Sequence, residues 1–173
     1  EARFGVDPMS RTAENLAREH DIARERQDAY AWRSQQRAAN AQREGWLAEE
    51  ISPLVAGQGR RATTVFLDEH LRPDTTPETL AALPPLLGPG TTITAGNASG
   101  LNDGAAAVLL ASGEAVARHG LLPLARVLGQ ASAGVEPRVM GIGPVPAIRR
   151  LLGRLGLALD DFDRIEINEA FAA

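Results

Sequence analysis

The sequence changes character along its length, and these changes restrict the folds that the chain can adopt. Residues 12–51 are rich in Ala, Arg, Glu and Gln and contain no proline, which predicts one or two exposed helices. Residues 52–94 are rich in proline and glycine and contain one β-favouring stretch, 63–67. We therefore expect a long irregular excursion with a short strand in this region. Excursions of this length are uncommon inside a compact domain, and many of them are functional.

From residue 91 onward, β-favouring and helical stretches alternate. The expected strands are 91–94, a buried strand at 105–111, 124–129 and 164–168. The expected helices are 113–119 and 146–155, and Gly156 stands at the end of the second one. Alternation of this kind predicts an α/β fold with layers of helix and sheet.

Residue types that are absent exclude several kinds of chemistry within these residues. All 18 basic residues are arginine, which excludes Schiff-base, pyridoxal and P-loop lysines. The absence of cysteine excludes thiolate catalysis, thiolate zinc sites and disulfides. A net charge of −4 and an aromatic content of 4% make nucleic acid a poor candidate partner. The longest strongly apolar run, 105–111, is far shorter than the ~20 residues that cross a bilayer, so no membrane partner is expected.

The acidic and histidine residues do not predict a metal site. One acidic cluster lacks the spacing of a calcium loop and is interpreted as a solvated turn: Asp160, Asp161 and Asp163. The histidines form no pair with zinc-binding spacing and are interpreted as solvated or incidental: His20, His70 and His119. Arginines of the irregular excursion could meet phosphates, although scattered surface residues are the default interpretation: Arg60, Arg61 and Arg72.

Two glycine-rich loops and the last expected strand are candidate functional features. Residues 96–104 place three glycines at four-residue intervals between two expected strands. Two interpretations stay open, namely a loop whose backbone amides and Ser99 hydroxyl approach a ligand, or a tight connection between packed strands. The loop 139–146 is interpreted as a turn that begins a helix. Asn168 and Glu169 fall at or just past the C-terminal end of the last strand, where α/β sheets bind ligands. A carboxamide there can orient a water or donate to a developing oxyanion.

Taken together, motifs along the whole chain resemble the thiolase family, whose members make or cleave 3-ketoacyl-CoA. The motifs are "MSRTAENLA", "QDAYAWRSQQRA", "AEEISPL", "DEHLRP", "TAGNASGLNDGAAAVLLAS", "VMGIGPVPA" and "DDFDRIEINEAFAA". The wording "ASAGVEPRVMGIGPVPA" most resembles the subgroup that cleaves 3-oxoadipyl-CoA. The resemblance implies a five-layered α/β/α/β/α fold, incomplete here. Residues 1–94 would be a mostly helical and irregular loop domain over the coenzyme A site, 95–120 the end of the N-terminal half, and 121–173 the start of the C-terminal half.

The resemblance also implies a reaction. Thiolases take up the acyl group on a cysteine that a histidine activates, and they use a second cysteine as acid or base. The asparagine of an Asn-Glu-Ala-Phe motif holds a water that stabilises the enolate. Asn168 is the only member of that set here, so we expect the central part of a longer chain, inactive by itself. Family membership further implies coenzyme A and acyl-CoA as substrates, no tightly bound cofactor, a cytoplasmic location and a homodimer or homotetramer.

Further site residues follow from the resemblance, position by position. Those implied to contact the pantetheine arm are Ala95, Ala98 and Ser99. Those implied to line or border the acyl pocket are Met9, Met140, Ala170 and Phe171. Those implied near the nucleotide are Arg72 and, flanking the adenine, Thr79, Leu83 and Leu87.

Two departures from the family pattern and one alternative function complete the expectations. Ala23 replaces the usual helix-capping serine, which costs about 1 kcal/mol. Leu87 stands where an aromatic residue is common, which weakens adenine stacking. The alternative is a non-catalytic coenzyme A-binding or interaction module, a truncated relative that keeps the cover over the ligand without the chemistry.

Overall fold

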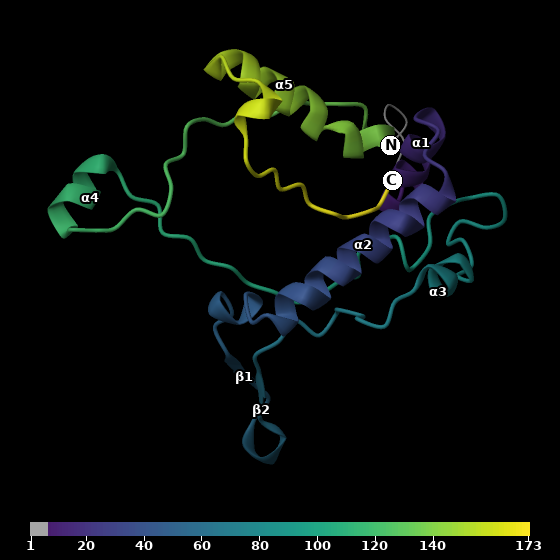
Figure 1. Ribbon diagram of the computed structural model, residues 1–173, viewed down its shortest axis with the longest axis horizontal. Coiled ribbons are helices and arrows are strands. Elements are labelled where there is room, and N and C mark those ends of the chain that lie inside the picture. Colours follow the sequence, from purple (N-terminus) through teal and green to yellow (C-terminus); the bar gives the residue numbers. More distant parts are fainter. Residues whose placement is uncertain (1–6) are drawn as a thin grey trace.

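The computed structural model describes residues 7–173 (Figure 1). Its elements are, in chain order, α1 (Met9–Glu19), α2 (Arg24–Arg43), η1 (Leu47–Glu49), β1 (Leu54–Ala56), η2 (Gly59–Arg61), β2 (Thr63–Val65), α3 (Pro77–Ala81), α4 (Gly113–His119), η3 (Pro137–Ile142), α5 (Pro144–Leu155) and η4 (Leu159–Asp161). Elements labelled η are 3-10 helices. Residues 162–173, called here the C-terminal segment, return across the molecule and end beside α1 and α2 (Figure 1).

The helices expected in the N-terminal region are confirmed as α1 and α2. The buried side chains of α1 recur at three- and four-residue steps, as in Ala13, Leu16 and Ala17, and α1 packs against η3. Helix α2 begins after Ala23, which supplies no side-chain cap. Gly45, just beyond the end of α2, has a φ of 81°, which is why the helix stops there.

The helices expected in the C-terminal half are confirmed as α4 and α5. The Ser112 hydroxyl accepts a hydrogen bond from the N–H of Ala115 (3.2 Å) and caps α4. Helix α5 begins two residues earlier than expected, at Pro144, because the fixed φ of proline suits a first helical turn. Gly120 and Gly156 end these helices in the left-handed conformation.

The irregular excursion contains a hairpin that projects from the rest of the chain (Figure 1). Strands β1 and β2 pair antiparallel, with Leu54 opposite Val65. The strand expected at 63–67 is therefore confirmed over its first three residues. Gly57 follows β1 with a φ of 84°, and a Cβ at this position would lie 2.7 Å from the carbonyl oxygen of Arg61. The turn of the hairpin consequently requires glycine there.

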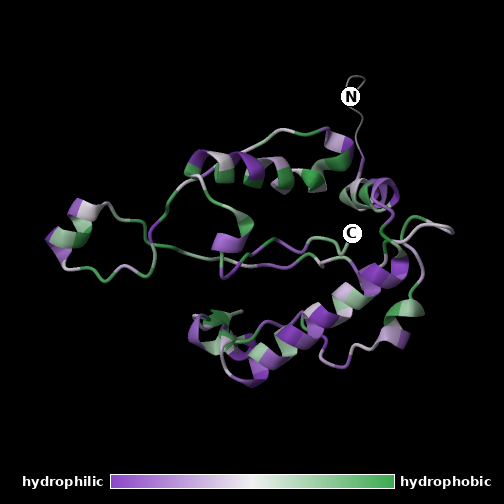
Figure 2. Cartoon of the chain, turned by 45° about the horizontal axis from the view of Figure 1, so that its top comes forward, coloured by the Kyte–Doolittle hydropathy of each residue, from purple (hydrophilic) through white to green (hydrophobic). Residues whose placement is uncertain are grey.

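The prediction of a buried strand at 105–111 is wrong. Within the described residues this segment pairs with no other strand, and the side chains of Leu109 and Leu110 are 82% and 79% exposed. Figure 2 shows hydrophobic residues along the extended connections on both sides of α4. A strand forms only through hydrogen bonds to a neighbouring strand. Although residues 105–111 are apolar, residues 7–173 contain no strand that pairs with them.

Three other expected strands also remain unformed in residues 7–173, for the same reason. Residues 124–129 and 164–168 form no strand, and Leu124 lies in a bend. Residues 91–94 keep a single antiparallel bridge, between Pro85 and Thr94, and the N–H of Leu86 donates to the carbonyl of Ile93 at 2.8 Å. Their β-favouring composition alone forms no strand, because the hydrogen-bonded ladder that defines a strand is missing among residues 7–173.

A small core forms where α1 and its neighbours meet. Its buried apolar residues are Ala13, Leu16, Ala17, Leu80, Ile93 and Val139. The buried polar and charged residues are Thr12, Glu14, Gln27, Asp28, Thr94 and Asn97. Because buried polar groups are stable only when they are hydrogen-bonded, the partners of this second set fix how the surrounding segments lie.

Candidate functional site

A hollow of about 150 Å³ opens where α2, the loop 96–99 and the C-terminal segment meet. Its walls are formed by Tyr30, Ala31, Ser34, Gln35, His70, Gly96, Asn97, Ala98, Ser99, Glu169 and Ala172. These residues come from four separate parts of the sequence, so only the tertiary fold assembles the hollow. Two of the residues predicted for the pantetheine arm, Ala98 and Ser99, lie in its wall.

The loop 96–99 is joined to the C-terminal segment by backbone hydrogen bonds. The N–H of Ser99 donates to the carbonyl of Ala170 (2.9 Å), and Ala98 and Phe171 form an antiparallel bridge. The N–H of Ala172 donates to the carbonyl of Asn97, also at 2.9 Å. The structure therefore places residues predicted for the pantetheine arm directly beside residues predicted for the acyl pocket.

Gly96 allows α3 and the residues that follow it to approach the loop closely. A Cβ at this position would lie 2.5 Å from Leu80 Cδ2 and 2.6 Å from Leu83 Cδ1. The imidazole of His70 packs against Gly100, the residue that follows the loop. Gly104 faces open space. Close packing thus accounts for the first two glycines, and Ser99 between them faces the hollow.

Asn97 holds the loop through every polar atom of its carboxamide. Its Oδ1 accepts from the N–H of Thr94 (2.8 Å), and its Nδ2 donates to Asp28 Oδ1 (2.9 Å) and to the carbonyl of Thr92 (3.0 Å). Asp28 also accepts from Arg24 Nε at 2.7 Å. A partly buried ion pair between Arg24 and Asp28 on α2 therefore anchors the loop, and no local pattern in the sequence indicates it.

A second buried carboxylate, that of Glu14 on α1, fixes the segment before the loop. Its Oε2 accepts from the N–H groups of Thr92 (2.8 Å) and Ile93 (3.3 Å) and from the Thr92 hydroxyl (3.0 Å). Gln27 on α2 donates to that same hydroxyl at 2.9 Å. Both N-terminal helices thus position the strand-like segment that leads into the loop.

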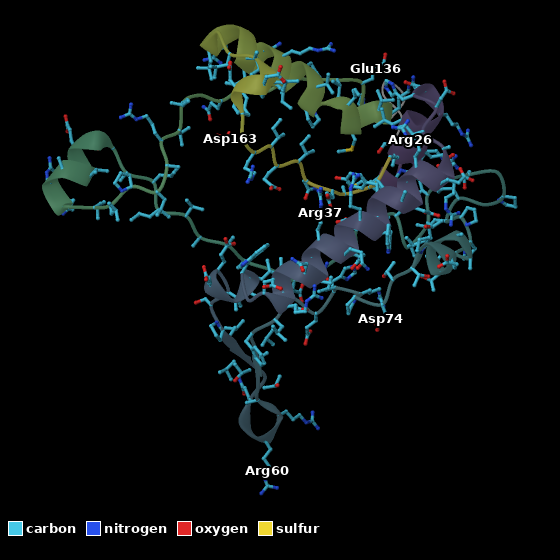
Figure 3. All side chains as sticks on the ribbon, viewed as in Figure 1. Arg26, Arg37, Arg60, Asp74, Glu136 and Asp163 are labelled. Atoms are coloured by element: carbon cyan, nitrogen blue, oxygen red, sulfur yellow. The ribbon has the colours of Figure 1, made fainter. Side chains whose placement is uncertain are left out.

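Glu169 connects the C-terminal segment to α2. Its carboxylate accepts hydrogen bonds from the hydroxyl of Tyr30 (2.7 Å) and from that of Ser34. These bonds, first that of Ser34 and then that of Tyr30, hold the pKa of Glu169 below its ordinary value, and the nearby Arg37 and Arg33 add to this effect. Arg37, labelled in Figure 3, lies on the side of α2 that faces the C-terminal segment. The pKa of Tyr30 is raised, chiefly because its hydroxyl donates to Glu169.

The predicted catalytic residue and the predicted acyl-pocket residues are not part of the wall of the hollow. Asn168 is exposed and immediately precedes Glu169, so the two hydroxyls that hold Glu169 restrain the backbone of Asn168 as well. Met9 and Met140 are about half exposed, on the mutually packed elements α1 and η3. Ala95 is exposed, one residue before Gly96.

The residues predicted near the nucleotide are spread over a wider area. The backbone N–H of Arg72 donates to Gln35 Oε1 (2.9 Å), while the residue is exposed. The Thr79 hydroxyl accepts from the N–H of Thr76 (3.0 Å), so this side chain caps α3. Leu83 packs against the loop at Gly96. Leu87 is half-buried. Two of these four residues therefore contact residues of the wall, Leu83 at Gly96 and Arg72 at Gln35.

Several residues of the site could not be found from sequence spacing. Tyr30, Ser34, Asn97 and His70 lie far from the C-terminal motif along the chain, and only the fold brings them to it. His70 was expected to be solvated or incidental; it is exposed, but it also forms part of the wall. The "GNAS" and "NEAF" wordings were the available signals for Asn97 and Glu169.

Two other classes of site are not found among residues 7–173. No three acidic or histidine side chains of this part of the chain gather in a way that could hold a metal ion. None of its helices combines the length and the apolar character that a membrane span needs. The buried acids Glu14 and Asp28 have protein partners instead, namely backbone amides, a hydroxyl, arginines and Asn97.

Two family models match the chain. The N-terminal thiolase domain matches residues 3–114 and the C-terminal thiolase domain matches residues 121–173. The beta-ketoadipyl-CoA thiolase of Pseudomonas aeruginosa is 61% identical over 99% of this chain and 43% of that protein. The 3-oxoadipyl-CoA/3-oxo-5,6-dehydrosuberyl-CoA thiolase of Escherichia coli is 55% identical, with the same coverage.

Solved structures agree with these sequence matches. An acetyl-CoA acetyltransferase from Bacillus anthracis superimposes with a TM-score of 0.92 at 47% identity, over 95% of this chain and 42% of that one. Human mitochondrial 3-ketoacyl-CoA thiolase in complex with CoA gives a TM-score of 0.89 at 44% identity, over 99% and 48%. The chain spans less than half the length of these relatives. The predicted family and the predicted fold class, a thiolase fold that is incomplete here, are confirmed. The chain belongs to the thiolase family.

Proposed function

We propose that the protein is an acyl-CoA C-acyltransferase, which cleaves a 3-ketoacyl-CoA with coenzyme A or catalyses the reverse Claisen condensation. The observation that supports it best is the pairing of the loop with the C-terminal segment. Ser99 is hydrogen-bonded to Ala170, and Ala98 forms a bridge with Phe171. These contacts place Ala98 and Ser99, which are implied for the thioester arm and line the hollow, directly beside Ala170 and Phe171, which are implied for the acyl group. Thiolysis requires both groups to lie side by side, because the bond that breaks is next to the thioester.

The proposed substrate is 3-oxoadipyl-CoA. Support comes from the relatives named as beta-ketoadipyl-CoA thiolases, which are 60% and 61% identical to nearly the whole chain. Cleavage between C2 and C3 of this substrate yields acetyl-CoA, and the remaining succinyl group is transferred to the incoming coenzyme A. Both products are thioesters, so atoms and charges balance without an oxidant or a metal.

The proposed chemistry assigns Asn168 to the enolate. As the nascent acetyl-CoA enolate forms, the Asn168 carboxamide would hold the water that donates to its oxygen. The acyl-enzyme step needs a cysteine, and these 173 residues contain none, so the mechanism requires one from outside them. Coenzyme A acts as a substrate in this scheme, with no tightly bound cofactor.

The remaining proposals concern the arrangement of the ligand and of the protein. Residues 1–94 would form the loop domain that covers coenzyme A, with Arg72 near the nucleotide and Thr79, Leu83 and Leu87 around the adenine. Residues 95–120 and 121–173 would belong to the two halves of the thiolase fold, and Met9 and Met140 would line the acyl pocket. Ala95 would contact the pantetheine arm with Ala98 and Ser99. The assembly would be a cytoplasmic homodimer or homotetramer.

The test is thiolysis of 3-oxoadipyl-CoA by the complete protein, with chromatographic detection of acetyl-CoA and succinyl-CoA. We expect both products in equal amounts and dependent on coenzyme A. Binding of coenzyme A without either product would support the non-catalytic module instead. Products from acetoacetyl-CoA but not from 3-oxoadipyl-CoA would keep the reaction class and overturn the substrate.

The proposed contact of Ser99 with the pantetheine arm has its own test. Ser99→Ala removes one hydroxyl from the wall of the hollow and leaves the backbone bond to Ala170 in place. We expect the Kd for coenzyme A, measured by calorimetry, to rise about 3- to 10-fold, the loss of one hydrogen bond. Ser112→Ala, which removes the exposed cap of α4, serves as the control. An unchanged Kd for Ser99→Ala would contradict the contact.

A further inference from the structure

We infer that Asn97 is a positioning residue for coenzyme A, since it fixes the main chain of Ala98 and Ser99 in the orientation in which the loop faces the hollow. The inference rests on the proposed function, in which this loop contacts the pantetheine arm. Asn97 is not among the residues that the resemblance assigns to ligand binding. Its role follows from its contacts, which connect three parts of the chain.

The carboxamide of Asn97 has no free hydrogen-bonding group. The residue is 3% exposed, its Oδ1 accepts from the Thr94 N–H, and its two Nδ2 hydrogens are donated to Asp28 and to the Thr92 carbonyl. The distances lie between 2.8 and 3.0 Å. Three hydrogen bonds in the interior hold the Asn97 side chain in one rotamer. They thereby fix the orientation of the Asn97 backbone, from which Ala98 and Ser99 continue.

The backbone of Asn97 extends this restraint to the other side of the site. Its carbonyl accepts from the N–H of Ala172, and two residues later the N–H of Ser99 donates to the carbonyl of Ala170. The C-terminal segment therefore takes its position from the same loop. A displacement of Asn97 would move both walls of the hollow together.

The partner of Asn97 on α2 is itself fixed. Asp28 is 7% exposed, and its other oxygen accepts from Arg24 Nε at 2.7 Å. Arg24 Nη2 donates to the carbonyls of Leu80 (2.7 Å) and Leu83 (3.1 Å). Because Leu80 and Leu83 pack against Gly96, the network also supports the loop from its opposite face.

Only an asparagine satisfies this set of partners. An aspartate would place an oxygen against Asp28 Oδ1 and the Thr92 carbonyl, where Nδ2 now donates at 2.9 and 3.0 Å. An alanine would remove the hydrogen-bond partner of two buried groups, the Thr94 N–H and Asp28 Oδ1, and of the partly buried Thr92 carbonyl. The chemical identity of the residue is therefore dictated by its surroundings, and the substitution by aspartate changes hydrogen-bond polarity at nearly constant shape.

The experiment uses the complete protein and compares Asn97→Asp, Asp28→Asn and the double variant with the control Asn102→Asp. Asn102 carries the same chemical change in an exposed part of the same motif, where Nδ2 makes one long bond of 3.3 Å to the Gly100 carbonyl. For each protein, the Kd for coenzyme A, the KM for coenzyme A, kcat and the thermal melting curve are measured.

We expect Asn97→Asp to raise the Kd and KM for coenzyme A about tenfold while kcat changes less than about threefold. Asp28→Asn should raise them about threefold, since it disturbs one of the three contacts. The double variant should recover much of the affinity, because the amide introduced at position 28 can donate to the carboxylate introduced at position 97. The control should match the wild-type protein in all four measurements.

Several results would overturn the inference. A folded Asn97→Asp protein with wild-type Kd would do so, as would a loss confined to kcat and melting temperature, which a purely structural role produces. If Asn97→Asp does not fold, Asp28→Asn decides, and an unchanged Kd in that variant counts against the role. If the wild-type protein itself does not bind coenzyme A, the proposed function fails and the inference with it. Wild-type binding that Ser99→Ala weakens, together with insensitivity to Asn97→Asp, overturns the inference alone.

Discussion

The contacts of individual residues decide the form of this site. Glu169 accepts hydrogen bonds from two hydroxyls of α2, those of Tyr30 and Ser34, which lie 139 and 135 residues earlier in the chain. Each hydroxyl favours the ionised carboxylate, because it donates to a negative charge. The carboxylate in turn favours the neutral form of Tyr30. The contribution of Glu169 to stability is therefore lost at acid pH, and that of Tyr30 is lost at alkaline pH.

The pKa of Glu169 is lower in the folded protein than its ordinary value of 4.5. Its contribution to the free energy of unfolding is present above that value and is lost as pH falls through the lower, folded-state pKa. We therefore expect Glu169→Gln to flatten the loss of stability between about pH 5 and pH 3. Denaturant unfolding at a series of pH values measures this slope.

Two variants complete that experiment. Glu50→Gln, which removes one carboxylate at an exposed position outside the site, is the matched control. For Tyr30 the pKa is raised above its ordinary value of 10.0, so its contribution is present below that value and is lost as pH rises through the folded-state pKa. Tyr30→Phe should remove this alkaline loss. An acid slope for Glu169→Gln equal to that of the wild-type protein would contradict the assigned bonds.

At the scale of the element, α2 contributes to the site although its start is weak. It supplies Tyr30 and Ser34 to the wall of the hollow, and its Asp28 accepts a hydrogen bond from Asn97. Its N-cap position is occupied by Ala23, with φ −63° and ψ 154°, the extended geometry that capping residues adopt. The backbone at position 23 therefore has the conformation of an N-cap, but the alanine side chain has no oxygen that could accept a hydrogen bond.

Ala23→Ser should stabilise α2 because its hydroxyl can accept from a first-turn N–H without any change of backbone. We expect the free energy of unfolding to rise by about 0.5–1 kcal/mol. The same substitution at Ala29, an exposed position inside α2, is the matched control and should lower stability slightly, since serine is a poorer helix former than alanine. Equal effects at both positions would show that the cap is not formed.

At the scale of the whole molecule, the apolar residues are distributed unevenly. The core of the described residues is small, whereas Leu110, Leu124 and Val127 are 79%, 99% and 76% exposed along extended segments. Figure 1 shows these segments running outward to α4 and back, away from the other helices. Exposed apolar runs of this extent promote association.

The 173 residues, prepared as a separate polypeptide, should consequently bind a hydrophobic dye and self-associate as their concentration rises. Light scattering after size-exclusion chromatography and dye fluorescence measure the two effects. Leu109→Ser and Leu110→Ser together should reduce dye binding, because both side chains are exposed and lie outside the core. A monomer at every concentration that binds no dye would show that these segments are covered within the chain.

Local features of this protein could be predicted because they depend on residues close together in sequence. The helices α1, α2, α4 and α5 follow from side-chain periodicity and from glycine and serine at their ends. The hairpin strand follows from a β-favouring run beside Gly57. The family follows from motif wording, with the loop before Gly100 and the Asn-Glu-Ala-Phe segment as its candidate ligand contacts.

The tertiary structure decided everything that depends on partners far along the chain. Residues 105–111 have the composition of a buried strand, but a strand needs hydrogen bonds from a neighbour, and none is present within residues 7–173. Asn97 reads as an ordinary loop residue until Asp28, Thr92 and Thr94 surround it. Sequence by itself determined local geometry and family, whereas the site exists only because buried hydrogen bonds between distant segments hold its walls together.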